Sequence, residues 1–149
     1  MPVIVVGADH PLGEAVIERL LGPDREIRAY VSDPAAVDSL KKRGAKVALG
    51  DLSDSSHVAG ASLHCFSVVL IGPAVGDGRD ISFAANAAEV FRGWAQAAEE
   101  AGARRIIWVT DDATPASSRE IARVAVGDRT PGEIAEEVAA KDDAASLSN

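Results

Sequence analysis

A short apolar run that ends in a glycine and leads directly into an amphipathic segment most limits how this 149-residue chain can fold. Val3–Val6 contains only β-branched residues, as is typical of a strand buried on both faces of a parallel sheet. After Gly7, apolar side chains recur at helical spacing as far as Leu21, where Gly22 and Pro23 end the pattern. Because a parallel strand reaches its neighbour through a crossover, this opening predicts alternating strands and helices.

The same alternation continues along the chain. Further strands are expected at residues 27–31, 46–49, 66–71 and 105–110, and helices from Pro34 to Arg43, from Ser55 to Ala59 and from Ile81 to Ala101. Residues 121–126 fit a sixth strand better than a helical turn, which is the alternative. Thr130–Glu133 is a capping box with proline at the first helical position, so a last helix is expected to run to about Ala145.

Short connections between alternating strands and helices predict an α/β architecture. Every parallel connection crosses over the sheet, and such crossovers place helices on both of its faces. The expected fold is therefore a doubly wound parallel sheet of about six strands in a three-layer α/β/α arrangement. No linker or repeat divides the sequence, so we expect a single domain over residues 1–149, with a frayed tail at residues 146–149.

The acidic composition argues against several classes of partner. Lysine and arginine together number 15 against 23 aspartates and glutamates, which gives a net charge of −8. Such a surface repels nucleic-acid backbones and anionic lipids, and no apolar stretch approaches the ~18 residues of a membrane span. Cys65 is the only cysteine, the three histidines lack metal-site spacing, and residues 1–7 fit a strand rather than a signal peptide. We expect a cytoplasmic protein with no metal, nucleic-acid or membrane partner.

Four motifs in order resemble those of a known superfamily. They are the glycine-containing turn Gly7–Gly13, Asp33 after the second strand, Gly50–Asp54 after the third, and residues 98–110 (AEEAGARRIIWVT) leading into the fifth. Together they resemble the atypical short-chain dehydrogenase/reductase superfamily, in particular its NmrA-like NAD(P)-binding Rossmann-fold branch. The resemblance covers about residues 1–112 and implies a dinucleotide site at the carboxyl ends of the strands.

The glycine turn can hold a pyrophosphate because a strand that turns sharply into a helix aims free amides and the helix dipole at one point. Gly7 permits the tight turn and Gly13 lets the helix pack closely against the strand. His10 occupies the middle position, where the superfamily has a glycine. Either the imidazole moves aside and donates to a phosphate, or it fills the cradle.

The resemblance implies a set of cofactor-binding positions. They are Gly7, Ala8, Asp9, His10, Leu12, Gly13, Ser32, Asp33, Asp51, Leu52, Gly72 and Pro73. Asp33 lies about 20 residues beyond Gly13, where a carboxylate accepts from a ribose 2′-hydroxyl, and Ser32 stands near the position where relatives often carry an arginine for a 2′-phosphate. NAD is therefore expected over NADP. The alternative role for Asp33 is the N-cap before Pro34.

The catalytic residues of the reductase relatives are not evident in this sequence. Those enzymes use a tyrosine with a lysine four residues later, whereas the only tyrosine here, Tyr30, lies inside the second strand. Thr110, Asp111 and His10 are the remaining candidates for acid–base chemistry.

We therefore expect a non-catalytic nucleotide-binding, sensor or regulatory module. The alternatives are a small NAD(P)-dependent oxidoreductase and a structural or interaction subunit with a degenerate nucleotide site. The long helix containing Trp94 is the expected contact with a second copy or a partner subunit.

Overall fold

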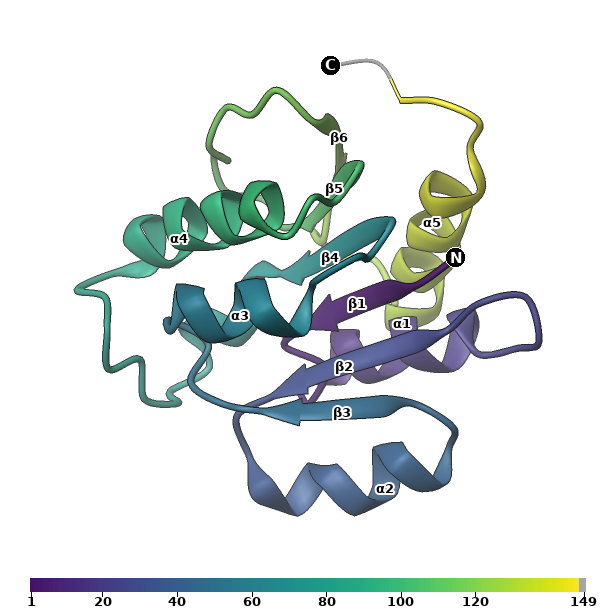
Figure 1. Cartoon of the computed structure of the whole chain (residues 1–149), viewed down its shortest axis with the longest axis horizontal. Coiled ribbons are helices and arrows are strands. Elements are labelled where there is room, and N and C mark those ends of the chain that lie inside the picture. The colour runs from purple at the N-terminus through teal and green to yellow at the C-terminus, as the bar shows by residue number, and fades with distance from the viewer. Residues whose placement is uncertain (148–149) are drawn as a thin grey trace.

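The computed structural model, which describes residues 1–147, contains one parallel sheet (Figure 1). Its six parallel strands lie in the order β3-β2-β1-β4-β5-β6. The chain adds strands toward one edge from β1 to β3 and toward the other edge from β4 to β6, so the order switches between β1 and β4 as in dinucleotide-binding folds. The strands are β1 (Val3–Val6), β2 (Ile27–Val31), β3 (Lys46–Leu49), β4 (Ser67–Ile71), β5 (Arg105–Val109) and β6 (Glu120–Val124). The predicted α/β class is confirmed, and so is the strand interpretation of the segment that became β6.

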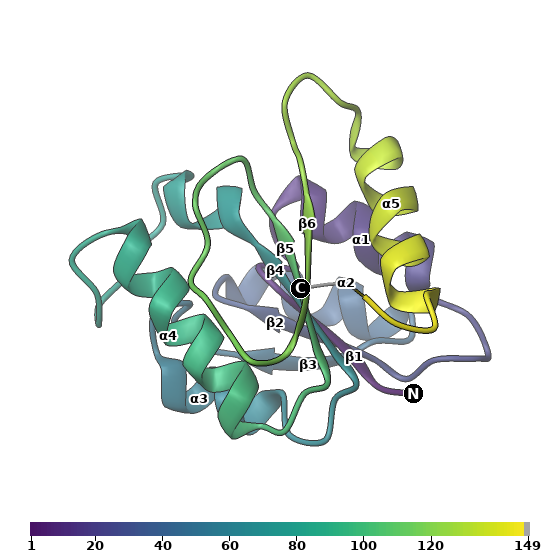
Figure 2. The same cartoon turned by 90° about the horizontal axis from the view of Figure 1, so that it is seen from above.

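Helices cover both faces of this sheet, as expected for three layers. They are α1 (Pro11–Leu20), α2 (Val37–Lys42), α3 (Ser55–Ala61), α4 (Ala87–Glu100) and α5 (Pro131–Asp143). Helices α1 and α5 pack together on one side, and α3 and α4 pack together on the other (Figure 2). Among the helices of residues 1–147, none combines the length and the apolar character needed to cross a bilayer.

An aromatic cluster fills the core between α4 and the sheet. Phe91 stacks on Trp94 with ring centroids 5.6 Å apart and lies 5.1 Å from Trp108 of β5. Trp94 is only 1% exposed, and its indole N–H donates to the carbonyl of Leu52 at 2.7 Å. The Trp94 side chain is therefore buried within its own chain and is not exposed to a partner. Assembly through other residues of α4 stays a prediction.

Helix α4 begins six residues later than the sequence pattern predicted. Asn86 caps it by accepting from the amide of Glu89 at 3.0 Å. Upstream, the amide of Ser82 donates to Asp51 and that of Phe83 to Ser53, so neither amide is available for a helix. Residues 77–86 instead form a loop at the carboxyl ends of the strands. Phe83, which lies within the predicted helical range, is 68% exposed in this loop.

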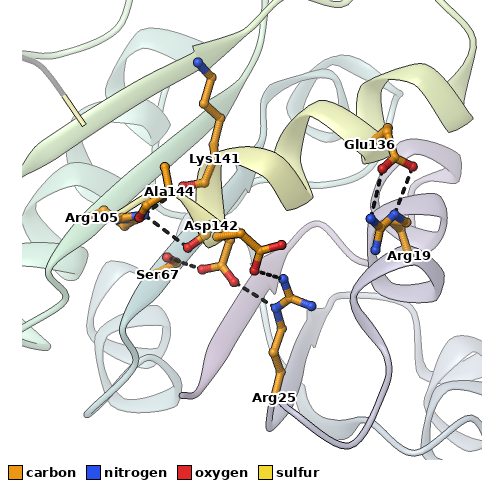
Figure 3. A network of polar contacts seen from close by, with 9 residues as sticks. Arg19, Arg25, Ser67, Arg105, Glu136, Lys141, Asp142 and Ala144 are labelled. Carbon is orange, nitrogen blue, oxygen red and sulfur yellow. Dashed lines mark hydrogen bonds and ion pairs between the residues drawn. The ribbon is translucent and has the colours of Figure 1, made fainter. Parts of the chain in front are cut away.

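A polar network fixes the carboxyl end of α5 to the sheet (Figure 3). The buried guanidinium of Arg105 donates to the carbonyls of Lys141, Asp142 and Ala144 at 2.7, 3.1 and 2.8 Å. The chain that follows is tied down as well, since the amide of Leu147 donates to Glu120 and its side chain packs on the core. Leu147 of the tail predicted to fray thus has contacts with the rest of the chain, and residues 148–149 lie outside the described residues.

Candidate functional site

The glycine turn between β1 and α1 has the tight geometry that the sequence predicted. Gly7 has a φ of +88°, in the left-handed region that favours glycine, and a Cβ there would lie 2.9 Å from the Cβ of Ala74. A Cβ on Gly13 would lie 2.3 Å from the carbonyl oxygen of Gly7. Both glycines are thus required by close packing, and they hold the N-terminus of α1 directly after β1.

His10 caps helix α1 in this structure. Its Nδ1 accepts from the amide of Leu12 at 3.1 Å, and the amide of Glu14 donates to its carbonyl at 2.9 Å. Pro11 has no amide hydrogen to offer. The imidazole therefore takes one of the few donors that a pyrophosphate would use, which corresponds to the cradle-filling alternative. Burial lowers the pKa of His10 below its usual 6.5, and this favours the neutral ring that can accept a hydrogen bond.

Acid should weaken this cap, since a protonated imidazole cannot accept from Leu12. His10 is neutral in both states above about pH 6.5. As the pH falls below that value, the unfolded chain binds a proton first, so stability is lost until the pH passes the folded pKa. We expect His10→Asn, which caps without titrating, to lose less stability between pH 7.5 and 5.5 in urea unfolding. An equal loss in both proteins would contradict this role for His10.

A salt-bridge cluster joins the glycine turn to the loop after β4. Arg79 donates through Nη1 to Asp9 at 2.6 Å and to the hydroxyl of Ser32 at 3.0 Å, and it also pairs with Asp77. The hydrogen bonds to Asp77 and Asp9 raise the pKa of Arg79, and Arg79 in turn lowers the pKa of Asp77. Only 5% of the Asp9 side chain is exposed. This cluster of Asp9, Ser32, Asp77 and Arg79 is hereafter the Arg79 cluster.

The Arg79 cluster borders a pocket of about 820 Å³ at the carboxyl ends of the strands. Ligands of open α/β sheets bind at this edge, and the volume is in the usual range of small-molecule sites, roughly 300–1,000 Å³. The lining residues come from the end of β3 and from the loops after four strands: Asp9, Ser32, Asp33, Pro34, Leu49, Gly50, Asp51, Asp77, Gly78, Arg79, Asp80 and Ser82. Five of them are aspartates and one is an arginine, so the lining is strongly acidic.

Asp33 and Asp51, which the sequence predicted to contact an adenosine, line this pocket, but their carboxylates already accept hydrogen bonds within the chain. Asp33 caps the turn after β2 by accepting from the amide of Ala35 at 2.9 Å, as in the N-cap alternative. Hydrogen bonds from Ser53 and Ser82 hold the pKa of Asp51 below its usual range, although burial opposes them. Leu52 is fully buried rather than beside the pocket.

Thr110 and Asp111, two of the candidate acid–base groups, do not line this pocket and are tied to the backbone. Thr110 is 3% exposed and accepts from the amide of Asp112, while a Cβ on Gly72 would lie 2.8 Å from its hydroxyl. Asp111 accepts from the amides of residues 126 and 127, which lower its pKa. The Tyr30 hydroxyl donates to the carbonyl of Asp51, and burial raises its pKa. Residues 1–147 also bring no group of three or more potential metal ligands together.

Sequence reasoning missed Arg79, Asp77 and Ser82 as pocket residues. It placed the following segment in a long helix and so gave the loop no role. A usable signal was present in Gly76–Asp80, where two glycines and a lone arginine follow a buried strand whose end faces the pocket.

Comparisons with solved structures find similar folds in several reductases. The chain is 26% identical to an NADPH-dependent quinone oxidoreductase from Escherichia coli, with a TM-score of 0.55, over 72% of this chain and 34% of that one. The chain is 23% identical to a triphenylmethane reductase from Citrobacter sp. complexed with NADP(H), with a TM-score of 0.61, over 74% of this chain and 37% of that one. The chain thus spans about a third of the length of these two enzymes.

A third structure matches this chain over nearly its whole length. It is ChuY, an anaerobilin reductase from Escherichia coli O157:H7, with 16% identity, a TM-score of 0.66, and coverage of 98% of this chain and 92% of that one. At this identity the likeness shows the fold alone. No curated protein sequence is similar enough to count as a match.

The sequence profile of the NAD(P)H-binding family matches residues 7–147. The match begins at the first glycine of the turn and takes in every element from α1 to α5. This chain therefore belongs to the NAD(P)H-binding family, and its motifs resemble those of the NmrA-like group of atypical short-chain dehydrogenases/reductases.

Proposed function

We propose that this chain binds a nicotinamide dinucleotide across the carboxyl ends of its strands and prefers NAD(H) to NADP(H). The observation that carries the proposal is the acidic pocket next to the glycine turn, with five aspartates and one arginine in its lining. A ribose diol donates well to carboxylates such as Asp33. A 2′-phosphate would add about two negative charges to a lining that already carries an excess of them.

The residues fit the two parts of a dinucleotide differently. The pocket after β2 and β3 suits an adenosine ribose, and the two glycines let α1 begin directly after β1, where a pyrophosphate would approach the helix N-terminus. At the turn itself, a pyrophosphate would compete with the imidazole of His10 for the amide of Leu12. A bound nicotinamide would supply hydride transfer, while the residues described here would bind and orient the adenosine half.

We further propose that the chain acts as a binding or sensing module. Tyr30, Thr110 and Asp111 each have structural hydrogen bonds, so none is free to relay a proton. A small oxidoreductase is the second candidate, favoured by the 26% identity to a quinone oxidoreductase. Such an enzyme would transfer hydride to a substrate that takes its proton from water.

Titration calorimetry with NAD, NADH, NADP and NADPH tests dinucleotide binding. We expect measurable heats for NAD and NADH, with dissociation constants at least ~10-fold lower than for the phosphorylated pair, which corresponds to about 1.4 kcal/mol. Equal or tighter binding of NADP(H) would overturn the preference. No heat and no thermal shift at millimolar concentrations of any of the four would favour a structural subunit with a closed site.

Following NADH absorbance with quinone and carbonyl substrates distinguishes an oxidoreductase from a binding module. A binding module should consume NADH no faster than the same mixture without protein. Turnover that Asp111→Asn and His10→Ala leave unchanged would support hydride transfer without either side chain.

A further inference from the structure

A buried carboxylate of this chain occupies an anion site beside the pocket. One oxygen of Asp9 accepts from the amides of Ser32 and Asp33 at 3.1 and 2.9 Å, and the other accepts from Arg79 at 2.6 Å. The hydroxyl of Ser32 lies 3.0 Å from the same guanidinium nitrogen. Two amides and one guanidinium therefore converge on a single side chain that is 5% exposed, and the Ser32 hydroxyl accepts from the same guanidinium.

This donor set is the kind that holds a phosphate monoester. Arginine and backbone amides make short, charge-assisted hydrogen bonds to phosphate oxygens, and a hydroxyl adds a further donor. Ser32 and Asp33 directly follow β2, which is where dinucleotide-binding folds meet the 2′ position of the adenosine ribose. The donors therefore lie where the 2′-phosphate of NADP would bind. The amides come from the residues after β2, and the guanidinium comes from the loop after β4.

We propose that Asp9 determines cofactor specificity by acting as an internal anion in the site that a 2′-phosphate would otherwise use. This inference rests on the proposed binding of a dinucleotide in the pocket. The carboxylate engages all three N–H donors and repels a second anion, while a ribose hydroxyl can still donate to it. Asp9 thus excludes NADP(H) even though Arg79 supplies the cation that a 2′-phosphate requires.

Removing the Asp9 carboxylate should therefore allow the site to bind the 2′-phosphate of NADP. Asp9→Ser leaves the donors of Ser32, Asp33 and Arg79 in place and opens space between them. Arg79 keeps its ion pair with Asp77, which holds the guanidinium at the pocket. We expect the ratio of the dissociation constants for NADP and NAD to fall at least ten-fold, mainly because NADP binds more tightly.

The experiment is titration calorimetry of the wild type, Asp9→Ser and Asp9→Asn with NAD, NADP and adenosine 2′,5′-bisphosphate. The bisphosphate carries the 2′-phosphate without a pyrophosphate, so its binding does not depend on whether His10 leaves Leu12. Asp9→Asn keeps the shape of the side chain and supplies the answer if Asp9→Ser does not fold. Circular dichroism of each variant establishes that it is folded.

Two further variants separate the specific contact from general charge. Asp38→Asn removes the same charge from helix α2, outside the pocket lining, and leaves the donors bound to Asp9, so we expect it to change the ratio less than two-fold. Arg79→Ala in the Asp9→Ser background should abolish the increase in NADP affinity. If the wild type binds NAD and both Asp9 variants keep the wild-type ratio, the inference is overturned and the proposed function stands. If no variant binds any of the three ligands, both fail.

Discussion

Arg105→Leu is expected to lower the free energy of unfolding by about 3–5 kcal/mol, measured by urea unfolding at pH 7. Arg105 is fully buried on β5, and its guanidinium satisfies three carbonyls at the end of α5 (Figure 3). It also pairs with Glu120 at 3.2 Å and lies 4.7 Å above the ring of Phe66. Leucine would leave the carbonyls and the carboxylate of Glu120 without this donor.

Arg104→Leu is the matched control because Arg104 pairs with the same glutamate. Its side chain is 57% exposed, so we expect a loss below about 1 kcal/mol. Similar losses for the two variants would mean that the buried guanidinium does not anchor α5. A loss confined to Arg105→Leu would establish that the last helix depends on a contact from the sheet.

Gly13→Ala is expected to cost about 3 kcal/mol of stability and to abolish dinucleotide binding. A Cβ at this position would lie 2.3 Å from the carbonyl oxygen of Gly7 and 2.7 Å from the Cα of Ala8. Both are backbone atoms, so the strain is relieved only if α1 moves away from β1. That movement would carry the N-terminus of α1 away from the position where a pyrophosphate would bind. Urea unfolding and calorimetry with NADH measure the two effects.

Gly60→Ala provides the opposite case in the same protein. Gly60 lies within α3, and a Cβ there would have no neighbour within 4 Å. Alanine should stabilise the chain by roughly 0.5–1 kcal/mol, since glycine is costly inside a helix. If Gly13→Ala were as well tolerated as Gly60→Ala, close packing of the glycine turn would not be what positions the helix.

Local patterns were sufficient to predict the sheet and the glycine turn. The β-branched run Val3–Val6 and the positive φ of Gly7 depend on neighbouring residues, so the sequence carries them directly. The capping box at Thr130 is equally local and is present as expected, with Glu133 at its third position. These features fixed the fold and the place where α1 begins.

The rest of the site depends on contacts between residues far apart in the sequence. Helical spacing placed Phe83 in α4, but the amide of Phe83 donates to Ser53, thirty residues away. Arg79 likewise reaches the pocket only because the loop folds back onto β2. The apolar spacing of Trp94 gave its helix face correctly but not its partner, the carbonyl of Leu52. Single-sequence patterns do not contain such pairings.

The most direct test of the account is to map NADH binding on the backbone amides by heteronuclear NMR. We predict shift changes at residues 7–13, at Ser32 and Asp33, and around Asp51, because these amides surround the glycine turn and its pocket. The amides of β6 and α5 should stay unchanged. Binding that moves only those distant amides, with none at residues 7–13, would contradict the proposed site.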